Sequence, residues 1–308
     1  MLIKSLKTLI LALTLPLIIS CGTEEQTQDG KPVETMNSGT FTVYCEEGLW
    51  DMMQKPFEWY DEDYEKAFIT SKKTTTHGAM AKLLAADARV IVIARDYTKR
   101  EDSLMEAYGV KDHQRFILAK DGLVFFTHKD FPIDTVTAEK IKKYFTEKEA
   151  SFSDFFPEVD FKPEFVINSH LSSEYVNLLK MAAGNKKLTR NLKFFGTHDS
   201  VLAYVRQNPQ SVGIGYLHYL HDKDFKMLKV GYVDSTGKYI NAKPVHQGWI
   251  VQGFYPYTVP LYAYLLEDRR NLPFWFATFL AKETKVQEYF MDSGIVPEFA
   301  RIALVPEE

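Results

Sequence analysis

Val90-Ile91-Val92-Ile93-Ala94-Arg95-Asp96-Tyr97-Thr98 is the stretch that decides the fold class. Its first four residues are apolar and β-branched, which is typical of a strand covered on both faces in a parallel sheet. Thr98 can cap a following helix, because Glu101 stands three positions later. A strand, an arginine-containing turn and a helix are therefore expected in direct succession.

The same alternation extends along the chain on both sides of this stretch. Strand-like runs cover residues 41–44, 122–127, 165–167, 213–216 and 262–265, and residues 248–254 also look extended. Helical spacing predicts helices over 50–60, 79–86, 137–145, 172–183, 201–207 and 272–293. This alternation predicts an α/β architecture with mostly parallel sheets. The strands outnumber those of one ordinary sheet, so we expect two α/β lobes.

The chain opens with the pattern of a secretory signal. Lys4 and Lys7 precede the apolar run 9–19, which would span about 17 Å as a helix, too short for a hydrocarbon core of roughly 30 Å. Ser20 and Cys21 then resemble the cleavage site of a lipoprotein, in which the thiol of Cys21 accepts lipid. We expect residues 1–20 to be a lipoprotein signal peptide. The alternative is an ordinary signal peptide that contains a cysteine.

Residues 21–40 are polar and offer almost nothing to bury. Such a composition does not offset the entropy cost of ordering, so we expect a flexible tether and a globular part that begins near Phe41. The protein would then lie outside the cytoplasmic membrane, in the periplasm or on the cell surface, anchored through lipid on Cys21.

The overall composition is that of a globular protein with a sizeable core. The 308 residues are 45% hydrophobic and 14% aromatic, and the formal net charge is −4. An acidic balance argues against a nucleic-acid partner. After the signal no run approaches the roughly 18 apolar residues of a membrane span. Aromatic residues along the predicted helix 272–293 are expected to pack in the core.

Cysteine and histidine usage gives little support to catalysis or metal binding. Cys21 is assigned to lipid, which leaves Cys45 without a disulfide partner. Cys45 follows the strand-like run 41–44, where burial is expected, although a catalytic thiol is the alternative. The eight histidines lack HExxH or HxH spacing, so we expect no metal and no cofactor.

Several motifs together resemble the phosphate-binding proteins of Pst-type ABC transporters, a class of periplasmic solute-binding protein. The stretch 90–98 looks like the binding loop that follows a strand in this family, and residues 118–127 look like its crossing strand. Residues 135–145 resemble a family helix, and Asn208-Pro209 with Val212-Gly213-Ile214-Gly215-Tyr216 resembles a family strand. Residues 255–262 are similar to the segment YP-x-x-RPLY, and Gly294-Ile295-Val296-Pro297 to the closing motif.

This resemblance implies two α/β lobes joined by two crossing strands, the type II periplasmic-binding-protein-like fold. Lobe one would comprise residues 41–124 plus 250–308, and lobe two residues 125–249. The ligand would be inorganic phosphate or a similar oxyanion, enclosed between the lobes and handed to an ABC permease. The resemblance therefore implies a binding protein and not an enzyme. We expect it to be a monomer.

Candidate ligand-binding residues lie in loops at strand ends, where helix N-termini leave N–H groups free for an anion. They are Glu46, Glu47 and Gly48 after the first strand, Thr76, Arg95 and Asp96, and Asn168, Ser172 and Ser173 in lobe two. Hydroxyls add donors, and an arginine adds a forked contact. A glutamate can accept the proton of monohydrogen phosphate.

Each candidate also has an alternative role. Ser172 could be a helix N-cap without a ligand, and Arg95 could form a surface ion pair. Glu46 and Glu47 could both face solvent.

The sequence departs from the family pattern at two places that matter for the ligand. The lobe-two loop 168–174 lacks the arginine, glycine and threonine of the pattern R-x-x-x-SGT. Val259 stands where the segment YP-x-x-RPLY has its arginine. The alternative function is therefore a lipoprotein scaffold or sensor of the same fold that binds another oxyanion or no tight ligand. A hydrolase is a third hypothesis, which no GxSxG, HExxH or nucleotide-binding loop supports.

Overall fold

Three strands and three helices over residues 39–108 form the first part of the molecule, and the predicted strand 90–93 is one of them. The structure is a computed structural model that describes residues 34–299; the predicted signal peptide, Cys21 and the tether as far as residue 33 lie outside this range. The elements are β1 (Gly39–Glu46), α1 (Trp50–Asp63), β2 (Ala67–Thr74), α2 (Thr76–Leu84), β3 (Val90–Ile93) and α3 (Lys99–Tyr108). β1 pairs in parallel with both β2 and β3.

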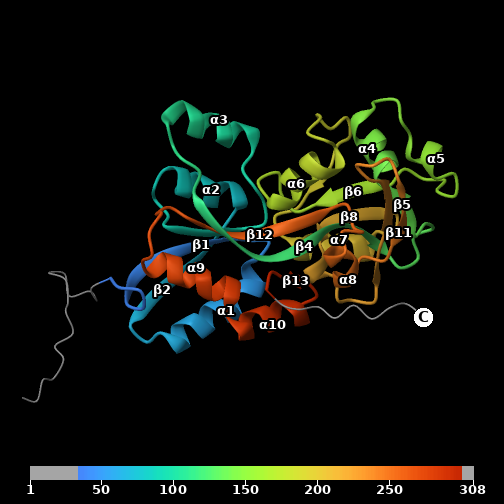
Figure 1. Ribbon diagram of the computed structural model, residues 1–308. Coiled ribbons are helices and arrows are strands. Elements are labelled where there is room, and N and C mark those ends of the chain that lie inside the picture. The colour runs from blue at the N-terminus through green and yellow to red at the C-terminus, as the bar shows by residue number, and fades with distance from the viewer. Residues whose placement is uncertain (1–33, 300–308) are drawn as a thin grey trace, which may run out of the picture.

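A long strand, β4 (Gln114–His128), runs through both halves of the molecule. Its residues 114–122 pair antiparallel with β12 (Thr258–Leu265), and its residues 123–127 pair antiparallel with β8 (Ser211–Tyr216). In Figure 1, β4 and β12 lie side by side along the middle of the molecule. The partners of β4 change between Gly122 and Leu123, and the predicted lobe boundaries themselves stay predictions.

The segment between β4 and β12 builds the second lobe. It contains β5 (Thr135–Thr137), α4 (Ala138–Thr146), α5 (Phe152–Phe155), β6 (Glu164–Ile167), α6 (Ser173–Asn177), the π-helical turn η1 (Leu178–Ala182), β7 (Lys193–Phe194) and α7 (His198–Gln207). After β8 come the 3-10 turn η2 (Leu217–Tyr219), β9 (Phe225–Met227), β10 (Lys229–Val233), β11 (Tyr239–Lys243) and α8 (Gln247–Val251).

The chain then returns to the first lobe. β12 is followed by α9 (Leu272–Lys282), α10 (Thr284–Asp292) and the short strand β13 (Val296–Pro297). The main sheet has the order β2-β1-β3-β12-β4-β8-β6-β7, with β9 and β13 also paired to β4, and β11-β10-β5 form a smaller sheet. Figure 1 shows α2 and α3 on one face of the first lobe and α1, α9 and α10 on the other. The fold is a mixed α/β arrangement of two lobes, as expected.

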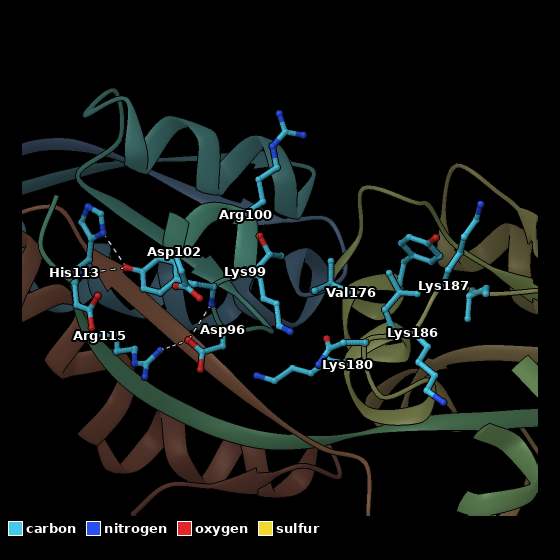
Figure 2. A pocket seen from close by; sticks show the side chains of 17 residues that line it. Asp96, Lys99, Arg100, Asp102, His113, Arg115, Val176, Lys180, Lys186 and Lys187 are labelled. Carbon is cyan, nitrogen blue, oxygen red and sulfur yellow. Dashed lines mark hydrogen bonds and ion pairs between the residues drawn. The ribbon is translucent and has the colours of Figure 1, made fainter. Parts of the chain in front are cut away.

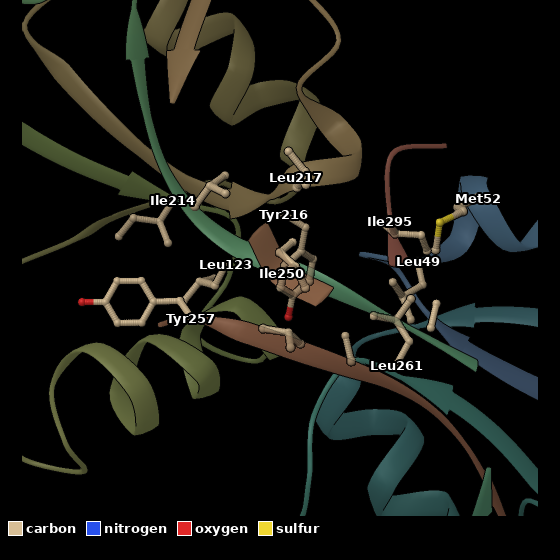
Figure 3. Packing of buried hydrophobic residues seen from close by; sticks show 14 of the residues in the cluster. Leu49, Met52, Leu123, Ile214, Tyr216, Leu217, Ile250, Tyr257, Leu261 and Ile295 are labelled. Atoms are coloured by element: carbon tan, nitrogen blue, oxygen red, sulfur yellow. The ribbon is translucent and has the colours of Figure 1, made fainter. Parts of the chain in front are cut away.

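One continuous hydrophobic core runs through both lobes. Figure 3 shows side chains of this core, with Leu49 and Leu261 toward one end and Ile214 and Tyr257 toward the other. Aromatic packing fixes the helices of the first lobe, where the ring of Phe276 lies 4.9 Å from that of Tyr60. Full burial of such a side chain contributes about 2–3 kcal/mol. The expectation that the aromatic residues of 272–293 pack in the core is confirmed for Phe279 and Phe290.

Three local predictions differ from the structure. Residues 247–251 form helix α8 instead of an extended segment, because the His246 side chain caps it by accepting from Gly248 N. The last helix is interrupted at Glu283, where the backbone is extended between α9 and α10. β4 pairs only in antiparallel fashion with β12, β8, β9 and β13, so the sheet is mixed. In addition, β1 begins at Gly39, two residues before the expected start at Phe41.

Candidate functional site

The carboxylate of Glu46 occupies the meeting point of loops from both lobes. Glu46 is the last residue of β1 and is fully buried. Its Oε2 accepts a hydrogen bond of 2.5 Å from Thr76 Oγ1 at the start of α2, in the first lobe. Its Oε1 accepts a hydrogen bond of 2.6 Å from Ser173 Oγ at the start of α6, in the second lobe. The side chain therefore links the lobes.

The protonation of Glu46 is balanced near neutrality. Burial and the neighbouring Glu174 carboxyl raise the pKa of Glu46, whereas hydrogen bonds from Ser173, Thr76 and the backbone of Ala94 lower it; the result is about 7. The donors come from the ends of β2, β3 and β6, and all three converge on one carboxylate. Such a set of donors is able to hold an oxyanion, and in the structure the oxygens that they contact are those of Glu46.

Second-lobe side chains position Ser173. Tyr216, at the end of β8, donates from its hydroxyl to Ser173 Oγ at 2.7 Å. Asn177 Nδ2 donates to Tyr216 Oη at 3.0 Å and to Ala94 O at 2.7 Å. All these side chains are buried, so each bond is shielded from water. The network fixes the hydroxyl of Ser173 toward the first lobe.

Three further hydrogen bonds connect the two lobes. Asn168 Nδ2 donates to Glu47 Oε1 at 3.4 Å, and the hydroxyl of Tyr219 donates to Gly48 O. His77 N donates to Leu171 O at 3.2 Å. Burial raises the pKa of Glu47 as well, although this residue stays half exposed. The loops that carry the predicted ligand-binding residues are therefore in direct contact.

Ser172 serves its own helix in the structure. Its hydroxyl accepts from Tyr175 N, as an N-cap does, and donates to Ser169 O at 2.8 Å. Ser173, one position later, is the residue whose hydroxyl reaches the other lobe. Of these two neighbouring serines, Ser172 caps its helix and Ser173 contacts the other lobe.

Arg95 forms a buried ion pair with Glu101. Its two terminal nitrogens donate to Glu101 Oε2 and Oε1, each at 2.7 Å, and both side chains are buried. The same Glu101 also closes the capping box of α3 predicted at Thr98. Asp96 accepts from Tyr97 N and pairs with Arg115. Contact of Arg95 or Asp96 with a ligand stays a prediction.

The structure adds residues that the sequence analysis did not select. Tyr216 lies in the strand motif that carried the family resemblance, and Glu174 directly follows Ser173. Asp121 and His218 form a buried pair, with 2.5 Å between Asp121 Oδ2 and His218 Nδ1. Asp121 lies in β4 and His218 in η2. The two residues are 97 positions apart in the sequence, so no local pattern could have predicted their contact.

The surroundings of Cys45 do not favour a catalytic thiol, and the described part of the chain has no cluster of metal ligands. Cys45 is fully buried, and burial together with the Glu46 carboxyl raises the pKa of its thiol, which disfavours the thiolate. Within residues 34–299, no three histidine, cysteine or acidic side chains come together as metal ligands do. No helix in that part of the chain is long and apolar enough to cross a membrane.

Comparison with known proteins agrees with this architecture. Residues 26–284 match the family model described as the PBP superfamily domain. No curated protein sequence matches the chain. Many solved structures resemble this chain, and they include proteins described as phosphate-binding receptors.

Three of these structures are informative. A Clostridium perfringens protein described as a phosphate ABC transporter substrate-binding protein, solved with bound phosphate, has 14% identity and a TM-score of 0.66 over 84% of this chain and 99% of its own. An ABC-type phosphate transport receptor from Vibrio cholerae has 15% identity and a TM-score of 0.65, with 84% and 99% covered. PstS from Borrelia burgdorferi has 16% identity and a TM-score of 0.55, with 84% and 98% covered. These likenesses confirm the fold that the motifs indicated.

Proposed function

Because the chain belongs to the PBP superfamily, we propose that it is the substrate-binding protein of an ABC transporter and holds phosphate in the cleft between its lobes. The family model and the similar structures describe binding proteins, which agrees with the expectation that the chain is not an enzyme. Phosphate is the ligand named for the similar structures from Clostridium perfringens and Vibrio cholerae.

One observation carries the proposal: hydroxyls from opposite lobes converge on a single buried oxyanion. Thr76 Oγ1 and Ser173 Oγ both donate to Glu46, and the backbone of Ala94 adds a third hydrogen bond. A carboxylate and a phosphate present the same kind of acceptor oxygens to such donors. We infer that phosphate accepts the hydrogen bonds of Thr76 and Ser173 when the Glu46 side chain moves away from them.

Without an arginine to offset its charge, phosphate can bind beside Glu46 only if the total negative charge of the ligand and this side chain is low. Arg95 is held by Glu101, and the lobe-two loop has Asn168 where the family pattern has its arginine. Burying phosphate beside an ionised Glu46 would place two negative charges together at high cost. A protonated Glu46 avoids this, and its proton can be shared with a phosphate oxygen. Above pH 7, where Glu46 is ionised, monohydrogen phosphate can donate its own proton to the carboxylate, whereas sulfate has no proton to donate, so the site favours phosphate over sulfate.

Closure of the lobes follows from the same geometry. A ligand can shift an open–closed equilibrium only through its differential affinity for the two states. Phosphate bound by Thr76 and Ser173 together has that differential affinity, because these residues belong to different lobes. Hinge closure of this kind is the signal that a permease can recognise.

Calorimetric titration of the purified protein with phosphate, sulfate and molybdate tests the proposal. We expect saturable binding of phosphate and weaker binding of the other two anions. Binding of no oxyanion at pH 6 or pH 8 would contradict it. That outcome would favour the scaffold or sensor, because Glu46 would then be a permanent occupant of its own site.

We also propose that the protein is a monomer tethered outside the cytoplasmic membrane by lipid on Cys21. The sequence around Ser20 and Cys21 supports this anchoring. Replacement Cys21→Ser should abolish incorporation of labelled fatty acid and release the protein from the membrane fraction. Unchanged labelling of that variant would contradict the assignment.

A further inference from the structure

A cavity lies on the surface where α3 of the first lobe faces α6 and η1 of the second. Its volume is about 810 Å³, within the range of sites for whole small molecules and more than one phosphate needs. Tyr97 and Arg115 line it from the first lobe, and Tyr175 and Leu188 line it from the second. The cavity includes Asp96, one of the predicted ligand-binding residues, but not Glu46, Thr76 or Ser173, so it is separate from the cluster of donors around Glu46.

Positive charge dominates the lining of this cavity. Its charged side chains are Lys99, Arg100, Arg115, Lys180, Lys186 and Lys187 against Asp96, Asp102 and Asp112. Arg115 is neutralised by Asp96, whereas the five other cations form no ion pair with any residue in the range 34–299. This excess occurs in a chain whose net charge is −4, so it is a local feature of the cavity.

Two of these cations approach one another from opposite lobes. Figure 2 shows Lys99 extending from α3 and Lys180 extending from η1 into the same gap. Lys186 and Lys187 follow on the loop after η1, and their charged groups, like that of Arg100, extend away from this gap toward solvent. Like charges that face each other across a gap repel, and an anion placed between them removes this repulsion. Cations on several sides of one cavity suit a ligand with several negative groups in a row.

We propose that this cavity binds an oligophosphate chain, supplied either as free polyphosphate or as the triphosphate of a nucleotide. Successive phosphate groups would contact Lys99 on one lobe and Lys180 on the other, and Arg100, Lys186 and Lys187 would add positive charge around the cavity. Tyr97 and Tyr175 would border the chain, where they could contact the base if the source is a nucleotide. A ligand that bridges these residues holds the lobes together independently of Glu46.

Titration calorimetry with tripolyphosphate, ATP, orthophosphate and sulfate tests this site. In the wild type we expect tripolyphosphate or ATP to bind at least about tenfold more tightly than sulfate. Binding of both assigns the shared phosphate chain, and binding of ATP alone assigns the nucleotide as the source. Failure of both to bind would overturn the proposal.

Charge-removing variants locate the binding. The double variant Lys99→Gln/Lys180→Gln should weaken tripolyphosphate or ATP about tenfold, because each exposed charge pair contributes modestly. The matched control Lys223→Gln/Lys238→Gln removes the same charge from exposed lysines elsewhere and should leave the affinity unchanged. Equal weakening in both variants would show a response to net charge and would overturn the site.

A third variant separates this proposal from the proposed function. Ser173→Ala should weaken orthophosphate while leaving tripolyphosphate affinity within about twofold of the wild type. If orthophosphate fails to bind but the lysine variants still weaken tripolyphosphate, the phosphate receptor is refuted and the oligophosphate site stands.

Discussion

Ser173 Oγ lies 2.6 Å from Glu46 Oε1, although the two residues are 127 positions apart and belong to different lobes. This bond joins the end of β1 to the start of α6 and places a buried carboxylate among donors suited to an external anion. The Glu46 carboxylate therefore competes with an external anion for the same hydrogen-bond donors. The ionisation of Glu46 should control both ligand affinity and stability.

Replacement Glu46→Gln should increase phosphate affinity at alkaline pH. The carboxylate is ionised above its pKa of about 7 and repels phosphate, whereas glutamine carries no charge. We expect about tenfold tighter binding at pH 8, which corresponds to about 1.4 kcal/mol, and little change at pH 5. Calorimetry at the two pH values measures this difference.

Glu47→Gln is the matched control, because Glu47 is adjacent and only half buried. It should change phosphate affinity by less than about threefold at either pH, since the solvent screens its charge. An equal gain in both variants would mean that overall charge, and not the position of Glu46, determines affinity.

Ser173→Ala and Ser172→Ala should separate ligand binding from helix capping. Loss of the cleft-facing hydroxyl in Ser173→Ala should weaken phosphate binding about tenfold or more, because hydrogen bonds to charged groups contribute roughly 1.5–3 kcal/mol. Ser172→Ala removes an N-cap and should lower the free energy of unfolding by about 1 kcal/mol. Its phosphate affinity should stay near that of the wild type. The reverse pattern would assign the ligand to Ser172.

The free energy of unfolding should fall as the pH rises from 4.5 to 7. Glu46 has a folded-state pKa of about 7 against an ordinary value of 4.5, so the folded state binds its proton more tightly. The resulting stabilisation is complete below pH 4.5 and is lost as the pH passes 7. Urea unfolding should show that Glu46→Gln reduces this decline by up to about 3 kcal/mol. Burial also raises the pKa of Glu174, which leaves part of the decline in both proteins. A decline of equal size in the variant would exclude Glu46 as its source.

Arg95→Ala should destabilise the fold strongly. It leaves the carboxylate of Glu101 buried without its partner, at a cost of about 3–5 kcal/mol. The control Lys129→Ala breaks the exposed pair with Asp224 and should cost less than about 1 kcal/mol. Chemical denaturation measures both. A small effect of Arg95→Ala on stability, with a large loss of phosphate affinity, would instead place Arg95 at the ligand.

The sequence allowed the two-lobed α/β fold to be predicted because its signals are local. The apolar run 90–93 is β3, and Thr98 forms the predicted capping box with Glu101. The helix over 247–251 was missed because only part of its support is local: His246 caps it, but Gln247 Nε2 also donates to the distant Met291 O and Ile295 O. The antiparallel pairing of β4 with β12 likewise joins segments far apart in sequence.

The candidate site was predictable as a set of loops but not as a set of contacts. Glu46, Thr76 and Ser173 were selected because each stands where a strand ends or a helix begins, and the structure brings them together. That Glu46 would accept both hydroxyls depends on the relative placement of the lobes, which no local pattern encodes. The buried pair of Arg95 and Glu101 depends on side-chain direction within the loop after β3.

A crystal structure of the protein grown in millimolar phosphate tests the central claim most directly. We predict phosphate between the lobes with its oxygens accepting from Thr76 Oγ1 and Ser173 Oγ, and Glu46 either displaced from both hydroxyls or hydrogen-bonded to the phosphate. A cleft without phosphate, in which Glu46 still accepts from Thr76 and Ser173, would contradict the account.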